Sequence, residues 1–349
     1  MARIALDAMG GDFAPQATVA GALLALAELD PLHTLLLVGR RAVIDEQLET
    51  LLRGEHASLA SQRDRLQIVD APDVIEMSDK PTIALKPSKQ HSSMVVGLRL
   101  QAEGQADAFV SAGNTGAQMA ASTVILKLHP GLNRPAIGTI FPTAREPVVV
   151  LDSGANVDCS AEELVQFARL GSVYAEDILG RKNPSVGLLS IGEEPEKGNA
   201  AVKEANQLLR AAAGLNFHGN VEGRDLPAGA SDRGRIDVVV CDGFVGNVVL
   251  KFYEGLAPVL IGMVAKHTGL EREQLVKSFR NLDYSEYGGA PLLGVKGVSI
   301  ISHGKSNARA IKNALLVGLR AAESRMSDHI GRRLADATAA AESTEAERA

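Results

Sequence analysis

Residues 108–116 read AFVSAGNTG, and this stretch contains the pattern that decides the fold. Ala108 to Val110 form a short apolar run of the kind that makes a buried strand. Small polar residues and two glycines follow at once, and a segment of helical period extends from Gly116 to Leu126. A strand, a glycine-containing loop and a helix in this order are typical of an α/β fold.

The same pattern recurs along the chain. The other predicted strands are Arg3–Leu6, Thr34–Val38, Leu66–Val69, Ala136–Ile140, Val148–Leu151, Ser185–Ile191, Ile236–Cys241 and Val298–Ser302. The other predicted helices are Ala14–Leu29, Arg41–Leu52, Met94–Glu103, Ala161–Leu179, Lys197–Ala212 and Asn307–Ser324. Because short strands alternate with longer helices, we predict an α/β fold with a largely parallel sheet.

Glycine and small polar residues follow five of the predicted strands. These loops are Asp7–Asp12, Ser111–Gly116, Asp152–Asn156, Asp242–Asn247 and Ser302–Asn307. In an open parallel sheet the carboxyl ends of the strands share one edge, where helix N-termini offer unpaired N–H groups to an anion. One such loop alone is an ordinary turn, but five together favour a ligand of phosphate or carboxylate type.

Several well-known anion and hydrolase motifs are absent from the sequence. There is no G-x-G triplet, so an NAD-binding Rossmann fingerprint is not present. A phosphate-binding Walker A loop ending at Gly304-Lys305-Ser306 would need glycine at position 299, which is Ser299. Neither G-x-S-x-G nor H-E-x-x-H occurs, so covalent serine hydrolysis and zinc hydrolysis have no local support.

Composition and charge narrow the class of protein further. The 36 Lys and Arg residues against 42 Asp and Glu give a net charge of −6, which argues against nucleic-acid binding. Cys159 and Cys241 form no C-x-x-C pair, as expected in a reducing cytosol. An acid at position 7 interrupts the N-terminal apolar residues too soon for a signal peptide, and the longest apolar candidate, Leu256–Ala265, is too short to span a bilayer.

Several side chains near these loops have two possible roles. Lys197, in the loop GEEPEKGN, is either a cation for an oxyanion or phosphate, or a solvated residue at a helix start. Cys241 stands at a strand end, where a buried inert thiol is more common than a nucleophile. His303 is either a base or a turn residue. The carboxylates of Asp7, Asp12 and Asp152 are either Mg²⁺ ligands or capping groups. We predict no metal.

Six motifs together resemble one family. They are LDAMGGDFAP (6–15), VSAGNTGA (110–117), LDSGANVD (151–158), IGEEPEKGN (191–199), CDGFVGNV (241–248) and GVKGVSIISHGKSN (294–307). In this order they resemble the phosphate acyltransferases of bacterial phospholipid synthesis, over residues 2–333. The resemblance implies the reversible transfer of a long-chain fatty acyl group from acyl-[acyl-carrier protein] to inorganic phosphate. The acyl phosphate then passes to a membrane glycerol-3-phosphate acyltransferase.

The resemblance also implies a structure and a set of site residues. The expected fold is a three-layer α/β/α homodimer related to phosphotransacetylase and isocitrate dehydrogenase, with no cofactor. Lys197 and Asn247 match the family's proposed catalytic Lys and Asn. The predicted substrate- and phosphate-binding residues are Asp7, Gly10, Gly11, Asp12, Gly113, Asn114, Thr115, Asp152, Asn156, Gly243, His303, Gly304 and Ser306. Because phosphate is itself the nucleophile and a thiolate leaves readily, this chemistry needs no Ser or Cys nucleophile.

Residues 251–281 read as an inserted helical hairpin, Phe252–His267 and Glu271–Phe279, joined at Thr268-Gly269. Its apolar positions at helical spacing are either dimer core or a peripheral contact with the inner face of the cell membrane, in an otherwise cytoplasmic protein. An acidic carrier protein needs a local basic patch. The candidates are Lys266, His267, Arg272, Lys277 and Arg280.

We predict a single catalytic domain over residues 1–333 and a disordered low-complexity tail over 334–349. Two other functions remain open on the sequence alone. One is a metal-dependent NAD(P) decarboxylating dehydrogenase of related fold, and the other is a non-enzymatic anion-binding or membrane scaffold.

Overall fold

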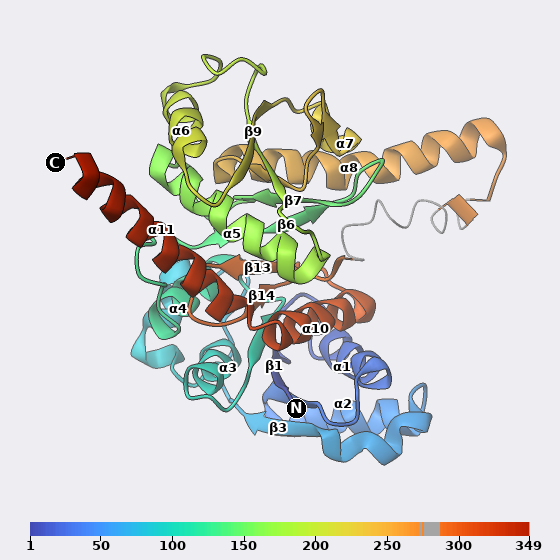
Figure 1. Cartoon of the computed structure of the whole chain (residues 1–349). Coiled ribbons are helices and arrows are strands. Elements are labelled where there is room, and N and C mark those ends of the chain that lie inside the picture. Colours follow the sequence, from blue (N-terminus) through green and yellow to red (C-terminus); the bar gives the residue numbers. More distant parts are fainter. Residues whose placement is uncertain (272–273, 276–286, 349) are drawn as a thin grey trace. The chain divides into compact units, whose positions relative to one another are not determined.

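The computed structural model describes residues 1–271, 274–275 and 287–348. The chain folds into two compact units (Figure 1). Unit 1 comprises Met1–Leu128 and Tyr287–Asp328, and unit 2 comprises His129–Glu286 and His329–Ala349. This differs from the single domain predicted over residues 1–333, because hydrophobic periodicity identifies strands without indicating which sheet each of them joins.

Unit 1 contributes the strands β3-β2-β1-β4-β14-β13, in this order, to a mostly parallel sheet. Its strands are β1 (Arg3–Asp7), β2 (Thr34–Gly39), β3 (Leu66–Asp70), β4 (Ala108–Ser111), β13 (Ala290–Leu293) and β14 (Ser299–Ile301). Its helices are α1 (Gln16–Glu28), α2 (Arg41–Arg53), α3 (Ser93–Ala102), α4 (Thr115–Ile125) and α10 (Ala308–Glu323), with 3-10 turns η1 (Ala57–Arg65), η2 (Pro81–Leu85) and η3 (Pro87–Lys89). Only β13 runs antiparallel to its described neighbour, β14.

Helices cover both faces of the unit 1 sheet. Figure 1 shows α3 and α4 on one side of the strands and α1, α2 and α10 on the other. Glycines allow close packing, since a Cβ on Gly97 of α3 would meet the Phe109 ring and a Cβ on Gly21 of α1 would lie 2.6 Å from Ile311 Cβ of α10. The central strands are therefore buried on both faces, which explains their continuous apolar runs.

Unit 2 contains a second sheet, with strand order β6-β7-β12-β8-β9. The strands of this sheet are β6 (Thr139–Phe141), β7 (Val148–Leu151), β8 (Ser185–Leu189), β9 (Asn216–Val221) and β12 (Val238–Val240). Unit 2 also contains the short strand β5 (Ala136–Ile137) and the separate hairpin of β10 (Ala230–Ser231) and β11 (Gly234–Arg235). Its helices are α5 (Ala161–Leu179), α6 (Ala200–Ala211), α7 (Asp225–Ala228) and α8 (Gly243–Thr268), joined by the later part of α11 (Met326–Arg348). Strands β7, β12, β8 and β9 are parallel, and β6 is antiparallel to β7.

Alternate residues of the unit 2 strands face different helices. A Cβ on Gly171 of α5 would lie 2.6 Å from Val238 Cγ1, so Val238 faces α5. Its neighbour Val239 belongs to a buried cluster against which Val245 and Tyr253 of α8 pack. The period of two along the strand thus places one helical layer on each face, as a three-layer α/β/α arrangement requires.

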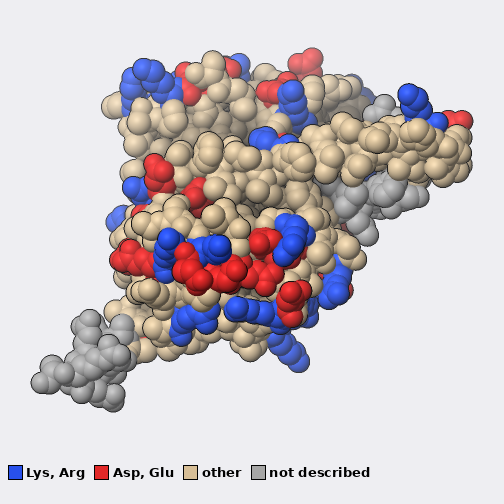
Figure 2. Space-filling model, turned by 90° about the horizontal axis from the view of Figure 1, so that it is seen from above, with Lys and Arg blue, Asp and Glu red and all other residues tan. Residues whose placement is uncertain are grey.

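Helix α8 exposes a long series of apolar side chains. The exposed ones are Phe244, Val248, Phe252, Leu256, Val259, Leu260 and Met263. Figure 2 shows the outer part of this helix as a mostly uncharged arm with charged side chains at its end. By length and composition alone, it is the one helix in the described part of the chain that could cross a membrane. The apolar run predicted from the sequence covered only Leu256–Ala265 because the charged residues Glu254 and Lys266 bound it, yet the helix is continuous over Gly243–Thr268.

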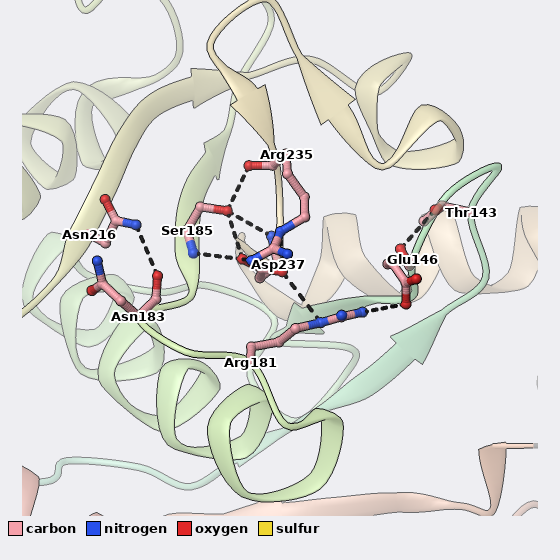
Figure 3. Close-up of polar contacts among 8 residues, drawn as sticks. All are labelled: Thr143, Glu146, Arg181, Asn183, Ser185, Asn216, Arg235 and Asp237. Carbon is pink, nitrogen blue, oxygen red and sulfur yellow. Dashed lines mark hydrogen bonds and ion pairs between the residues drawn. The ribbon is translucent and has the colours of Figure 1, made fainter.

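A buried carboxylate joins the amino ends of β8 and β12 (Figure 3). Asp237 is 1% exposed, and its Oδ2 accepts hydrogen bonds from the Ser185 N–H at 2.9 Å and the Ser185 hydroxyl at 3.0 Å. Its Oδ1 lies 3.0 Å from Arg235 Nε and 3.5 Å from Arg181 Nε. The second arm of Arg181 pairs with Glu146 at 3.0 Å. This network fixes the edge of the sheet opposite the glycine-containing loops.

Several elements differ from the sequence predictions. The predicted strand Ala136–Ile140 is divided into β5 and β6, and β9 and β13 were missed. The first hairpin helix begins at Gly243 as part of α8 and ends before Gly269, which has a φ of 69°. The predicted second helix, Glu271–Phe279, lies largely outside the described residues.

The predicted disordered tail is helical in the structure, because α11 continues to Arg348. Large apolar residues are absent there, but Ala and Glu have high intrinsic helix propensities. The preceding turns of α11 are anchored within unit 2, where Ile330 and Leu334 are buried and Arg333 pairs with Glu176 at 2.7 Å. An anchored helix can propagate beyond its buried turns when the residues that follow are good helix formers.

Candidate functional site

The candidate residues fall into two sets, one in each unit. In unit 1, the parallel pairing of β1 with β4 and of β4 with β14 places three strand ends side by side. The loops after these strands contain Asp7, Gly10, Gly11, Asp12, Gly113, Asn114, Thr115, His303, Gly304 and Ser306. The sequence prediction that these loops share one edge of a sheet is therefore confirmed for this set.

Asp7 organises the first two loops from a buried position. The side chain is 2% exposed, and its Oδ2 accepts a hydrogen bond of 2.8 Å from the Ser111 hydroxyl. Ser111 Oγ in turn accepts from Gly113 N–H at 3.0 Å, while Asp7 Oδ1 accepts from Met9 N–H at 3.1 Å. Burial raises the pKa of Asp7, although hydrogen bonds from Ser93, Ser111 and the adjacent backbone oppose this shift. In this structure Asp7 therefore holds the loops in shape.

Glycine is required at position 10 because the three loops approach each other closely. A Cβ there would lie 2.6 Å from Asp7 Oδ2 and 2.9 Å from the Gly113 nitrogen. The first and third loops are also joined directly, because Asp12 N–H donates to Gly304 O at 2.7 Å. These contacts give a compact, glycine-lined edge where a ligand can approach backbone N–H groups.

Asn114 caps helix α4 and fixes a neighbouring segment. Its Oδ1 accepts from Ala117 N–H at 3.0 Å, and its Nδ2 donates to Met77 O at 3.1 Å and to Asp79 O at 2.7 Å. The side chain is 8% exposed and fully engaged. The next residue, Thr115, is exposed at the helix N-terminus, where the macrodipole favours an anion.

The third loop presents His303 to solvent. Its Nδ1 accepts from Lys305 N–H at 3.1 Å, so the neutral ring carries its proton on Nε2. Ser306 is 9% exposed, and its hydroxyl shares a hydrogen bond of 2.8 Å with Ser302. The loop is thus held by serine and backbone groups while the imidazole faces outward.

In unit 2, Asp152 plays a part similar to that of Asp7. Its side chain has no exposed surface, and its Oδ1 accepts from the N–H groups of Ile137 at 3.0 Å, Gly154 at 3.2 Å and Ala155 at 3.1 Å. Its Oδ2 accepts from Asn156 N–H at 2.7 Å and from Asn156 Nδ2 at 2.9 Å. Burial raises the pKa of Asp152 against the effect of these bonds. Asp152 and Asn156 order the loop, and direct ligand contact by either stays a prediction.

The first turn of α8 packs tightly on this loop. Gly243 N–H donates to Asn156 O at 2.7 Å, and Asp242 Oδ1 caps the helix by accepting from Val245 N–H at 2.8 Å. One turn later, a Cβ on Gly154 would lie 3.5 Å from Asn247 Cβ and Oδ1, so the Asn247 side chain lies beside the Gly154 backbone. Packing of α8 on the Asp152 loop therefore positions Asn247.

Lys197 is carried by the loop after β8, on the same edge of the unit 2 sheet. Its N–H donates to Glu194 O at 3.0 Å, and a Cβ on Gly192 would lie 2.9 Å from Lys197 Cγ. Asn199 then caps α6 by accepting from Val202 N–H at 2.9 Å. Lys197 and Asn247 are both exposed, and neither side chain makes a hydrogen bond or ion pair with the residues that the structure describes.

The two cysteines lie near this edge but are poorly suited to act as nucleophiles. Cys241 is buried, and desolvation raises the pKa of its thiol well above the usual value. Desolvation also raises the pKa of Cys159 to about 12. Since the thiolate is the reactive form, the structure favours the inert reading of Cys241.

Within residues 1–271, 274–275 and 287–348, no three or more His, Cys, Asp or Glu side chains are grouped to hold an ion. The carboxylates of Asp7 and Asp152 are occupied by hydrogen bonds from the protein.

Two kinds of supporting residue were not predicted from the sequence. The Ser111 hydroxyl connects the second loop of unit 1 to the first, and the Ser302 hydroxyl bonds Ser306 within the third loop. Both residues stand inside quoted motifs at the ends of strands. Their positions were a usable signal. Asn220 contacts the Lys197 loop from β9, a strand that the apolar-run criterion did not detect.

Comparison with known proteins identifies the family. A family model described as fatty acid synthesis protein matches residues 2–329. The phosphate acyltransferase of Desulforamulus reducens is 49% identical over 332 residues, covering 93% of this chain and 94% of the relative. That of Thermosynechococcus vestitus is 47% identical over 350 residues, covering 97% of each chain.

Solved structures confirm the fold. A phosphotransacetylase from Streptococcus pyogenes matches with a TM-score of 0.61 and 18% identity, over 92% of this chain and 94% of that one. A branched-chain phosphotransacylase from Enterococcus faecalis matches with a TM-score of 0.56 and 16% identity, over 92% and 99%. Together with the two parallel-rich sheets and their helical layers, these matches confirm the predicted α/β/α class. The sequence identities over nearly the whole chain show that this protein belongs to the phosphate acyltransferase family.

Proposed function

We propose that this protein transfers a long-chain fatty acyl group reversibly from acyl-[acyl-carrier protein] to inorganic phosphate. Membership of the phosphate acyltransferase family supports acyl transfer to phosphate. The observation that carries the site assignment is that Lys197 and Asn247 lie on the same edge of the unit 2 sheet. Both are exposed, and neither side chain has a hydrogen-bond or ion-pair partner among the described residues. The buried carboxylates and thiols nearby are engaged or protonated, so hydrogen-bond donors are what this edge offers to a substrate.

The proposed chemistry needs donors more than a protein nucleophile. A phosphate oxygen attacks the thioester carbonyl carbon, forming a C–O bond and a tetrahedral oxyanion. The C–S bond then breaks, giving acyl phosphate and the carrier thiolate, which takes up a proton. In this proposal, Lys197 and Asn247 stabilise the oxyanion and the leaving sulfur. Phosphate binding by the glycine-containing loops of unit 1, where Thr115 and His303 are exposed, is a separate prediction.

A discharge assay tests this function directly. Palmitoyl-[acyl-carrier protein] is incubated with the protein with and without phosphate, and acyl phosphate is trapped with hydroxylamine. Lys197→Ala should lower kcat by about 100-fold or more while the fold is retained, because a preorganised oxyanion donor is removed. Lys203→Ala, an exposed lysine on α6, is the matched control and should leave kcat unchanged.

The rival functions predict different results in binding and turnover assays. Phosphate binding without turnover would indicate the scaffold, and turnover of a hydroxy acid with NAD(P) and Mg²⁺ would indicate the dehydrogenase. Wild-type turnover by a folded Lys197→Ala variant would refute the assignment of Lys197.

We also propose that the apolar face of α8 is covered in a homodimer. Its exposed Phe252, Val259 and Met263 resemble the core of an obligate interface more than a solvated helix. Met263→Glu should shift the mass in solution towards the monomer. If the mass is unchanged and the variant instead loses binding to anionic vesicles, α8 is the site of peripheral membrane contact.

The acidic carrier protein is proposed to dock on basic residues at the end of α8. Lys266 and His267 are exposed in its last turn, whereas Arg272, Lys277 and Arg280 lie outside the described residues. Lys266→Glu should raise KM for the acyl carrier substrate without changing KM for phosphate. The proposed product, a long-chain acyl phosphate, is an amphiphile suited to a membrane glycerol-3-phosphate acyltransferase, in keeping with a cytoplasmic enzyme at the inner face of the membrane.

A further inference from the structure

The turn that carries Lys197 is attached to strand β9 by a buried amide. Glu194 O accepts two hydrogen bonds, one of 3.0 Å from Lys197 N–H and one of 2.8 Å from Asn220 Nδ2. Asn220 is 1% exposed, so the donor end of this part-buried bond is shielded from water. The carbonyl that closes the Lys197 turn is therefore held from behind by a side chain.

A chain of hydrogen bonds extends from Asn220 to the surface. Asn206 Nδ2 on α6 donates to Asn220 Oδ1 at 2.7 Å, and Arg210 Nε donates to Asn206 Oδ1 at 2.8 Å. Asn206 is also 1% exposed. The Arg210 guanidinium lies over the Phe217 ring, 5.9 Å from its centroid, which limits its movement.

The donor-only guanidinium sets the direction of the whole chain. Arg210 has no acceptor, so Asn206 must turn its oxygen towards Arg210 and its NH₂ towards Asn220. Asn220 then presents its oxygen to Asn206 and its own NH₂ to the Glu194 carbonyl. Each amide is fixed in one orientation, and the last one is the orientation that holds the turn.

We propose that Asn206 and Asn220 are positioning residues for Lys197. Through the Glu194 carbonyl, the chain Arg210–Asn206–Asn220 sets the place and angle from which the Lys197 side chain leaves its turn. This inference rests on the proposed catalytic function of Lys197. Lysine has a long flexible side chain, so its effectiveness depends on a rigid base.

A weaker attachment lies at the surface and does not account for the same effect. Arg224 is 2.9 Å from Glu222 and 3.6 Å from Glu193, but its side chain is 73% exposed. Exposed ion pairs contribute little to rigidity. The buried amides are the structural basis of the fixed turn.

Asn206→Asp tests the direction of the chain with almost no change in shape. The new carboxylate retains its partner Arg210 but has no NH₂ to donate to Asn220. If Asn220 keeps its orientation, its oxygen faces an oxygen of the new carboxylate, and the two repel each other. If Asn220 turns over, its NH₂ donates to the carboxylate, but its oxygen then faces Glu194 O. The charge-assisted bond is the stronger, so the bond to Glu194 is lost.

The expected result is a decrease in kcat of about ten- to a hundredfold with KM for phosphate nearly unchanged, because a catalytic group is misplaced. Asn216→Asp is the matched control. Asn216 is on the same strand and its Nδ2 also donates to a backbone carbonyl, that of Asn183, at 3.0 Å, but away from the Lys197 turn. It should leave kcat unchanged.

Two further measurements separate positioning from a general effect on the fold. In a Lys197→Ala background, Asn206→Asp should lower the residual kcat no further, because the group that it positions is absent. Hydrogen exchange in the peptide covering Gly192–Asn199 should become faster in Asn206→Asp while the melting temperature changes little. Asn220→Ala, which deletes the bond outright, should give the same two results if Asn206→Asp fails to fold.

The outcomes distinguish this inference from the proposed function. If Lys197→Ala lowers kcat but Asn206→Asp leaves kcat and exchange at wild-type values, or lowers kcat equally in both backgrounds, the positioning role is refuted. If Lys197→Ala itself has wild-type turnover, the catalytic assignment of Lys197 fails and the positioning role fails with it.

Discussion

Gly243→Ala should loosen the contact between helix α8 and the Asp152 loop and thereby reduce both stability and activity. An ideal Cβ at this position would lie 2.5 Å from Asn156 O and 2.7 Å from Asp152 Oδ2. Real Cβ atoms almost never come closer than 3.0 Å to such an atom, so the helix or the loop must move by about 0.5 Å. Neither neighbour is the free end of a flexible side chain, because the Asp152 carboxylate is held by hydrogen bonds from the loop.

Two opposing terms set the size of the effect on stability. Overpacking of a rigid site costs about 1–3 kcal/mol. Replacing glycine in a helix by alanine stabilises it by up to about 1 kcal/mol, and less in the first turn. We therefore expect the free energy of unfolding, measured by urea denaturation, to fall by about 1–2 kcal/mol.

Activity should fall as well, because Asn247 lies one turn further along the same helix, beside Gly154. If Asn247 acts in catalysis as proposed, a shift of this size lowers kcat by about tenfold. The discharge assay with acyl carrier substrate and phosphate measures this loss.

Gly255→Ala is the control on the same helix, since nothing lies within 4 Å of a Cβ placed there. It should raise the free energy of unfolding by about 0.5–1 kcal/mol and leave kcat unchanged. If Gly243→Ala behaves like Gly255→Ala in both assays, glycine is not needed for the contact between α8 and the Asp152 loop.

Three further predictions follow from buried ionisable groups. Asp237→Ala should lower the free energy of unfolding, measured in urea, by about 3 kcal/mol, because it leaves two arginines without their buried partner. Glu49→Ala, which breaks an exposed ion pair, is the control and should change it by less than about 0.5 kcal/mol. Equal effects of the two substitutions would contradict this prediction. Burial raises the pKa of Asp7 above its usual value of 3.8, so its stabilising effect is full below that pH and is lost as pH rises through the folded-state pKa. Asp7→Asn should therefore gain stability relative to wild type as the pH rises above about 4, and a difference that does not change with pH would refute the assignment. Because burial raises the pKa of the thiols of Cys241 and Cys159, iodoacetamide should leave the native enzyme active at neutral pH, and rapid inactivation would show a reactive thiolate.

The sequence predicted the central strands well and the edge strands poorly, for a physical reason. Strands such as β7, with the sequence VVVL, are buried on both faces and therefore form continuous apolar runs. Strand β9, NFHGNV, is at the end of its sheet and carries His218 and Asn220, so hydrophobicity does not reveal it. Strand β13 contains Pro291, which lowers its strand propensity.

The candidate loops were predicted correctly as strand-end loops, but their division between two sheets was not predicted. All five were expected along one sheet, whereas three follow strands of unit 1 and two follow strands of unit 2, where the Lys197 loop joins them. The local sequence of a loop does not encode the partners of its strand. The structural roles of Asp7 and Asp152 could not be predicted either, because the sequence does not distinguish an aspartate that accepts hydrogen bonds within a loop from one that binds a ligand.

The order of the strands has a consequence for synthesis on the ribosome. The unit 2 sheet uses strands from one continuous stretch, between Thr139 and Val240, so all its partners emerge together. In unit 1, β14 pairs with β4 although nearly two hundred residues separate them in the chain, and α10 packs on α1 from even further away. The nascent chain therefore has an open edge at β4 and an uncovered face on α1 until the last quarter of the protein has been made. During that interval the earlier half of the sheet is the part most exposed to mispairing, and chaperone demand should be concentrated there.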